Sequence, residues 1–138
     1  MTDETTKSDV FSSVNVMVVD DEEFAQRFVT RILGMLGTGD VLTANNGADA
    51  LEKLAETDVA IDLIISDIEM PEVDGYEFVR KIRYGTVPKY KDVPILILTG
   101  KDTDENAQKA RFHKIDGFLV KPPNAEDLER KLRKALGL

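Results

Sequence analysis

Residues 15–21 read Asn-Val-Met-Val-Val-Asp-Asp (NVMVVDD), four apolar residues in a row followed by two adjacent carboxylates. Two more acids, Glu22 and Glu23, follow at once. An apolar run without polar alternation is typical of a parallel strand that is covered on both faces. The acidic pair at its end needs a separate explanation, because neighbouring carboxylates repel one another.

Four similar runs rich in Val, Ile and Leu follow along the chain. The predicted strands lie at 14–19, 41–44, 62–66, 93–98 and 117–120. Amphipathic stretches alternate with them and predict helices over 23–36, 48–55, 76–84, 103–113 and 125–136. The first helix is expected to bury one apolar stripe of residues four apart in the sequence, namely Phe24, Phe28, Ile32 and Leu36.

This alternation of strands and helices indicates βαβ crossovers. The sequence therefore predicts an α/β fold, in which a doubly wound five-stranded parallel sheet is flanked by five helices. Residues 14–138 form one domain in this interpretation. Residues 1–13 are polar and without pattern, and we expect them to form a flexible N-terminal tail.

Composition narrows the possible functions. The 138 residues carry a formal charge of −8, and residues 1–100 hold nine Lys/Arg against nineteen Asp/Glu. An acidic body argues against nucleic-acid binding, which depends on basic groups that neutralise phosphates. The chain has no cysteine, no apolar run of membrane-spanning length and no apolar stretch of a secretion signal near its start. A cytoplasmic protein that binds neither nucleic acid nor membrane is expected.

Side chains that can bind a ligand or take part in a reaction follow four of the five predicted strands. Asp20 and Asp21 follow the first strand and Asp67 follows the third. Thr99 follows the fourth strand, and Lys121 follows the fifth. Each has an ordinary explanation by itself, such as helix capping or local hydrogen bonding. Because ligands of open parallel sheets bind at the carboxyl ends of the strands, their coincidence at one edge indicates a site.

The residue types at this edge favour phosphoryl chemistry. Clustered carboxylates without Cys, and without a nearby His, form a hard oxygen site suited to Mg²⁺, with Mn²⁺ as a possible substitute. A carboxylate can also act as a nucleophile toward phosphorus and form an acyl phosphate. A cation, the ammonium of Lys121 and the hydroxyl of Thr99 would then neutralise the phosphoryl oxygens.

Four motifs at these strand ends resemble the receiver domain of two-component response regulators, most closely the single-domain chemotaxis type. They are VVDD at 18–21, DIEMPEVDGYEF at 67–78, LTG at 98–100 and FLVKP at 118–122. The resemblance covers residues 14–138 and implies a flavodoxin-like sheet with strand order 2-1-3-4-5. It also implies a phosphoaccepting signalling protein that catalyses only its own phosphotransfer and dephosphorylation.

The resemblance implies a role for each acid of the site. Asp67 is similar to the phosphorylated aspartate of the family. Asp21 and Asp67 are expected to ligate Mg²⁺ directly, together with the main-chain carbonyl of Glu69. Asp20 is expected to act mostly through bound water.

The same resemblance implies a switch. Lys121 would pair with the phosphoryl group, and Thr99 would move to hydrogen-bond it. Pro122 is similar to the family's cis-proline, and Phe118 matches the aromatic residue whose inward rotation accompanies activation. Glu69 and Lys101 flank the path of the hydrolytic water, and these long, oppositely charged side chains are predicted to slow dephosphorylation.

The implied phosphodonor is a sensor histidine kinase or a histidine phosphotransfer protein, and the output is a downstream protein target. The sequence stops directly after the last predicted helix, so we expect no attached output domain. A monomer and a phosphorylation-dependent dimer both stay open. The alternatives are a Mg²⁺-dependent phosphohydrolase with an aspartyl-phosphate intermediate, for which Glu69 has the spacing of a general acid, and a receiver fold used only for docking.

Overall fold

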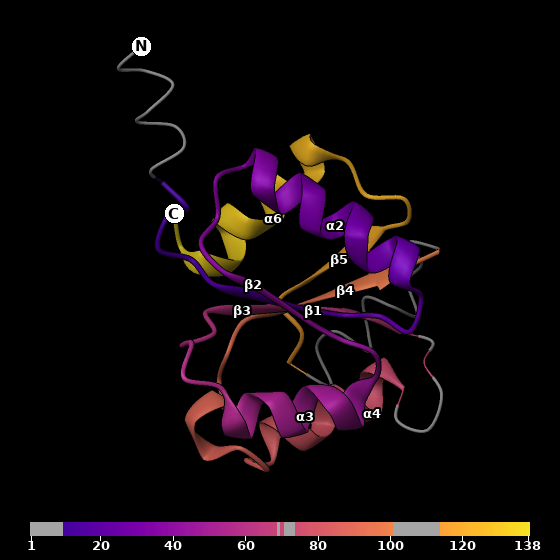
Figure 1. The fold of residues 1–138 in the computed structure, drawn as a ribbon, viewed down its shortest axis with the longest axis vertical. Helices are drawn as coiled ribbons and strands as arrows, with labels where there is room; N and C mark the ends of the chain where they lie inside the picture. Colours follow the sequence, from indigo (N-terminus) through magenta and orange to yellow (C-terminus); the bar gives the residue numbers. More distant parts are fainter. Residues whose placement is uncertain (1–9, 69, 71–73, 101–113) are drawn as a thin grey trace.

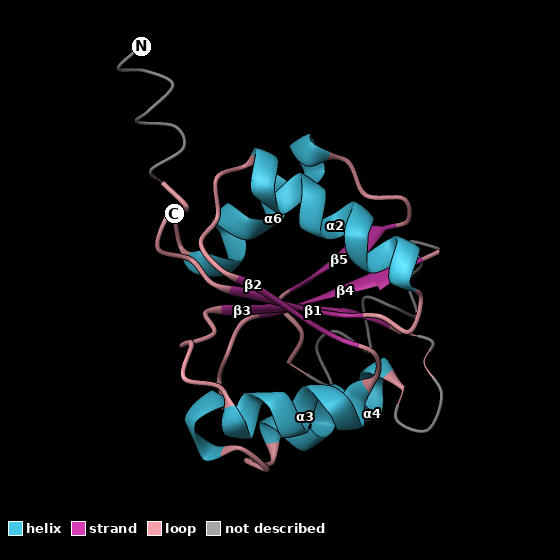
Figure 2. Ribbon diagram, in the orientation of Figure 1, coloured by secondary structure: helices cyan, strands magenta, loops and turns pink. Residues whose placement is uncertain are grey.

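The computed structural model describes residues 10–68, 70, 74–100 and 114–138, which form one sheet between two layers of helices (Figures 1 and 2). The strands are β1 (Val16–Val19), β2 (Val41–Ala44), β3 (Leu63–Asp67), β4 (Ile95–Thr99) and β5 (Gly117–Val120). The helices are α2 (Glu23–Met35), α3 (Gly47–Glu56), α4 (Gly75–Arg83) and α6 (Ala125–Leu136), with a short 3-10 turn η1 (Pro88–Tyr90). Over these described ranges, no helix is both long and apolar enough to cross a membrane.

All strand pairs are parallel, and the order across the sheet is β2-β1-β3-β4-β5. The predicted α/β fold and strand order are therefore confirmed. The described part of the chain holds four of the five predicted α-helices, and the fifth, over 103–113, lies outside it.

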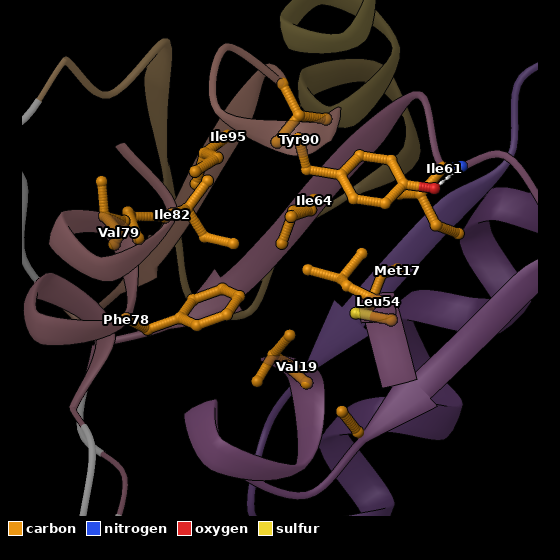
Figure 3. Packing of buried hydrophobic residues seen from close by; sticks show 14 of the residues in the cluster. Met17, Val19, Leu54, Ile61, Ile64, Phe78, Val79, Ile82, Tyr90 and Ile95 are labelled. Atoms are coloured by element: carbon orange, nitrogen blue, oxygen red, sulfur yellow. Dashed lines mark hydrogen bonds between the residues drawn. The ribbon is translucent and has the colours of Figure 1, made fainter. Parts of the chain in front are cut away.

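Alternation along β1 divides the core into two layers. Val16 and Val18 pack with α2 and α6, whereas Met17 and Val19 pack with α3 and α4. Figure 1 shows these helix pairs on opposite sides of the sheet. Figure 3 shows the second layer, where the buried hydroxyl of Tyr90 accepts a hydrogen bond from the backbone N–H of Ile61 at 3.2 Å. Both faces of β1 are thus buried, as its unbroken apolar run predicts.

The predicted stripe on the first helix is wrong at its N-terminal end. Ile32 is 6% exposed, but Phe28 is 38% exposed and Phe24 is 80% exposed. At 3.6 residues per turn, each step of four residues rotates by about 40° around the helix, so a row of such steps drifts off one face. The buried face of α2 contains Gln26 and Val29 instead.

The predicted tail also extends too far into the chain. Phe11 is 2% exposed and packs in the core layer of α2 and α6. The guanidinium of Arg133 lies 5.4 Å from the centre of its ring. The packed domain therefore begins before residue 14. The sequence pattern did not predict this, because one isolated apolar side chain can be buried without any periodicity around it.

Lys114 is the one non-glycine residue with positive φ among the described residues, at 58°. Its carbonyl accepts two hydrogen bonds from the guanidinium of Arg83, at 3.2 and 2.8 Å, and these hold the turn before β5. A left-handed backbone costs an L-residue about 1 kcal/mol or more, and glycine adopts it freely.

Lys114→Gly is therefore expected to raise the free energy of unfolding by about 0.5–1 kcal/mol, measured by urea denaturation. Lys91→Gly is a matched control, because the Lys91 carbonyl also accepts from Arg83 but its φ is −51°. The control should lose stability. Equal losses in both variants would contradict the strain at Lys114.

Candidate functional site

The five predicted strand-end residues all lie at one edge of the sheet. Asp67 is the last residue of β3 and Thr99 is the last residue of β4. Asp20 and Asp21 directly follow β1, and Lys121 directly follows β5. A cleft of about 740 Å³ opens at this edge, lined by Asp21, Glu22, Asp67, Ile68, Met70, Asp74, Leu98, Thr99, Gly100 and Lys121.

An ion pair between Asp67 and Lys121 spans the cleft. Nζ of Lys121 lies 2.8 Å from Oδ1 of Asp67, and the same oxygen accepts a hydrogen bond from the backbone N–H of Ile68 at 2.8 Å. Asp67 is only 5% exposed. Burial alone would lower the pKa of Lys121, but the hydrogen bond and charge of Asp67, with the charge of Asp20, raise it above its ordinary value. Lys121 is thus held as a cation beside a buried carboxylate.

Asp20 is the most deeply buried acid of the site, at 0% exposed. Its Oδ1 accepts a hydrogen bond from the backbone N–H of Glu22 at 2.9 Å. Its Oδ2 accepts no hydrogen bond, and Nζ of Lys121 lies 3.9 Å from it. Burial raises the pKa of Asp20, and the charges of Asp67 and Asp21 raise it further, against the opposing effects of the Glu22 N–H and Lys121.

These residues fit a hard divalent cation. All the acidic donors here are carboxylate oxygens, which Mg²⁺ and Mn²⁺ prefer. The buried Oδ2 of Asp20 has no hydrogen-bond partner, which is costly for an acceptor unless another positive group meets it. Asp20, Asp21 and Asp67 would hold such an ion. The expected carbonyl ligand of Glu69 lies outside the described residues.

Three residues of the expected switch, Thr99, Phe118 and Pro122, lie among the described residues. Thr99 is 6% exposed and lines the cleft, and its carbonyl accepts a hydrogen bond from the backbone N–H of Lys121 at 2.8 Å. The Lys121–Pro122 peptide is cis, as the resemblance implied. Phe118 is half-buried against the core layer of α3 and α4 and does not line the cleft. Lys101 lies outside the described residues.

Gln26 is a supporting residue that the sequence did not single out. It is 8% exposed on the inner face of α2. Its side-chain amide donates to the carbonyl of Asp20 at 2.6 Å, to the carbonyl of Ala44 at 3.1 Å, and to Oδ1 of Asn45 at 3.0 Å. Gln26 therefore ties the carboxyl end of β1, which holds the acidic pair, to the carboxyl end of β2. The only sign of it in the sequence was its spacing, since Gln26 lies three positions before the buried Val29 and so on the same face of the helix.

Gln26→Met keeps the length of this side chain but removes its donors, which leaves buried acceptors unsatisfied. The expected loss in the free energy of unfolding is about 2–3 kcal/mol in chelator-treated protein. Arg27→Met is the control, because Arg27 is exposed on the same helix, and its change should stay within about 0.5 kcal/mol. A Gln26→Met variant as stable as the control would show that this tie contributes nothing.

The sheet order together with the buried aspartate–lysine pair at its carboxyl edge defines a receiver domain. The chain belongs to the response regulator receiver domain family, whose profile matches residues 16–133. It is 32% identical over 124 residues to Chemotaxis protein CheY1 of Helicobacter pylori, covering 90% of this chain and 98% of that protein. It is 36% identical over 115 residues to Protein PilG of Pseudomonas aeruginosa, covering 83% and 82%.

Solved structures agree with this assignment. Chemotaxis response regulator CheY4 of Vibrio cholerae superposes with a TM-score of 0.79 at 36% identity, covering 89% of this chain and 98% of that one. A response regulator receiver domain protein from Clostridium thermocellum superposes with a TM-score of 0.77 at 29% identity, covering 90% and 94%. The resemblance found in the four motifs is thus confirmed, and the chain is a receiver domain similar to the CheY proteins.

Proposed function

We propose that this chain is a phosphoaccepting response regulator in which Asp67 receives a phosphoryl group in the presence of Mg²⁺. The observation that supports this most strongly is the buried carboxylate of Asp67, held 2.8 Å from the Lys121 ammonium beside Asp20 and Asp21. Such a group combines a nucleophile with a fixed positive charge for the incoming oxygens. The similarity to chemotaxis proteins and to PilG supports a signalling role.

In the proposed transfer, a carboxylate oxygen of Asp67 forms a bond to phosphorus while the bond from phosphorus to the donor breaks. With a phosphohistidine donor, the electron pair of the broken P–N bond stays on the imidazole. Lys121 neutralises phosphoryl charge, and the Thr99 hydroxyl would donate a hydrogen bond to a phosphoryl oxygen. A divalent cation, when bound, supplies further positive charge that lowers the repulsion between the phosphoryl group and the acids.

The proposed donor is a sensor histidine kinase or a histidine phosphotransfer protein in the cytoplasm, and the output is another protein. An apolar groove next to the cleft supports a protein donor. It is lined by Phe24, Ala25, Phe28, Val29, Leu98, Lys121, Pro122 and Pro123. Since Lys121 and Leu98 line both the groove and the cleft, a protein seated on the exposed Phe24 would stand beside Asp67.

The proposed function is tested by incubating the chain with acetyl phosphate and Mg²⁺ and measuring its intact mass. One phosphoryl group per chain is expected, and its formation should stop when a chelator is added. A phosphomonoester such as p-nitrophenyl phosphate is supplied in parallel. Repeated turnover of that ester would favour the phosphohydrolase, and the absence of any labelling would favour a docking-only receiver.

The effect of Glu69 and Lys101 on the lifetime of the phosphorylated state stays a prediction from the sequence. A Glu69→Asn, Lys101→Ala double variant is expected to lose its phosphoryl group faster, because the hydrolytic water gains access to the acyl phosphate. Decay is followed by intact mass after the donor is removed. An unchanged lifetime would exclude this role.

A further inference from the structure

Glu22 stands at the mouth of the cleft and has no structural role of the kind its position usually has. It is the N-cap residue of α2, with φ −100° and ψ 118°. N-cap side chains such as Ser or Asp normally accept a hydrogen bond from an amide of the first turn. Glu22 makes no such bond, although its backbone N–H donates to Asp20 Oδ1.

Its carboxylate instead lies with the acidic pair. One carboxylate oxygen from each of Asp20, Asp21 and Glu22 lies within 4.8 Å of the others, close enough for all three to meet one ion. A cluster of exposed acids alone would say little. Here, however, the cluster includes the fully buried Asp20, whose Oδ2 has no hydrogen-bond partner.

The charges of the cleft are also unbalanced. Besides Asp74, whose side chain caps α4, four carboxylates gather there, from Asp20, Asp21, Glu22 and Asp67, and among the described lining residues Lys121 is the one basic side chain. The ammonium of Lys121 is closest to Asp67, at 2.8 Å. The same ammonium lies 3.9 Å from Oδ2 of Asp20, so its single charge is shared among several carboxylates, and a divalent cation would offset the negative charge that remains.

The next residue shows what an ordinary acid at this helix end does. Oε1 of Glu23 lies 2.5 Å from a guanidinium nitrogen of Arg27, one turn along the helix, and its side chain is 74% exposed. Glu22 and Glu23 have the same charge and the same proximity to the helix N-terminus, where acids are favoured. They differ in which groups their carboxylates meet.

We propose that Glu22 is a fourth carboxylate of the cation site, and that it binds the divalent ion together with Asp20 and Asp21. This inference rests on the proposed Mg²⁺-dependent function. It assigns Glu22 a part in metal binding, beyond the helix-terminal acid that the sequence suggests.

The test is a calorimetric titration of unphosphorylated protein with Mg²⁺, without any phosphodonor. Glu22→Gln is expected to raise the Kd for Mg²⁺ by about tenfold, since a neighbouring charge is removed. Glu23→Gln removes the same charge one residue away and should change the Kd less than about twofold. Equal changes in the two variants would overturn the proposal, because they would reflect only the overall charge.

A second variant separates metal binding from helix capping. Glu22→Ser places a good N-cap residue at this position, so it should raise the Tm of the metal-free protein while weakening Mg²⁺ binding. If Glu22→Ser weakened neither binding nor the Mg²⁺-induced rise in Tm, Glu22 would not be a ligand. The proposed function fails in a different way, namely if the wild-type chain itself binds no Mg²⁺ or takes up no phosphoryl group.

Discussion

Asp67→Asn is expected to form no acyl phosphate with acetyl phosphate and Mg²⁺, under conditions that label the wild-type chain fully. The amide that replaces the carboxylate is a poor nucleophile toward phosphorus, and Lys121 loses the anion that holds it 2.8 Å away. The measurement is the fraction of hydroxylamine-labile phosphoryl group by intact mass, which should fall to background.

Asp58→Asn is the control for this experiment. It makes the same change of charge at an exposed position that does not line the cleft. Its labelling should match the wild type in rate and extent. Full hydroxylamine-labile labelling of Asp67→Asn would place the acceptor elsewhere.

Asp20→Asn is expected to stabilise the metal-free protein by about 1–2 kcal/mol, measured by urea denaturation with a chelator present. Asp20 is fully buried, and its Oδ2 accepts no hydrogen bond, so its charge is a cost to the folded state. Asn keeps the oxygen that accepts from the Glu22 N–H and removes that charge.

The destabilising effect of the Asp20 charge should also depend on pH. Burial raises the pKa of Asp20 above its ordinary 3.8, so the unfolded chain releases this proton at lower pH than the folded protein. The contribution of Asp20 therefore falls as pH rises from the ordinary value through the raised folded value. Asp20→Asn should lack this decline, and its advantage over the wild type should disappear at pH values below the ordinary one.

Added Mg²⁺ is expected to reverse the order of stability. The wild type should gain about 2.7 kcal/mol at a concentration a hundredfold above its Kd, and the variant should gain much less. Asp21→Asn, at an exposed position, should lose the gain from Mg²⁺ with a smaller change in the metal-free protein. If Asp20→Asn destabilised the chelated protein, the buried charge would not be a net cost.

The sheet and its polar edge were predictable because they depend on local patterns. Unbroken apolar runs identify buried parallel strands, and the polar residue that ends each run then falls at the same edge. Asp67 and Thr99 are thus the last residues of β3 and β4. The position of the site could therefore be predicted from the strand ends alone, without knowledge of side-chain geometry.

Features that depend on helix rotation and tertiary contact were not predictable in this way. Phe24 is exposed because rows of residues four apart drift around the helix. Gln26 became visible as a tie between β1 and β2 only with their carbonyls in place. Phe11 was predicted to lie in a flexible tail, because its burial under α6 depends on contacts with residues distant in the chain, which no local pattern shows.

The most direct test of the central claim is to map the phosphoryl group to one residue. The chain is phosphorylated with acetyl phosphate and Mg²⁺, reduced with borohydride, which converts an aspartyl phosphate to homoserine, and digested for peptide sequencing by mass spectrometry. Homoserine at position 67 and at no other aspartate is the predicted result. Homoserine at Asp20 or Asp21, or phosphate retained on another residue type, would contradict the account.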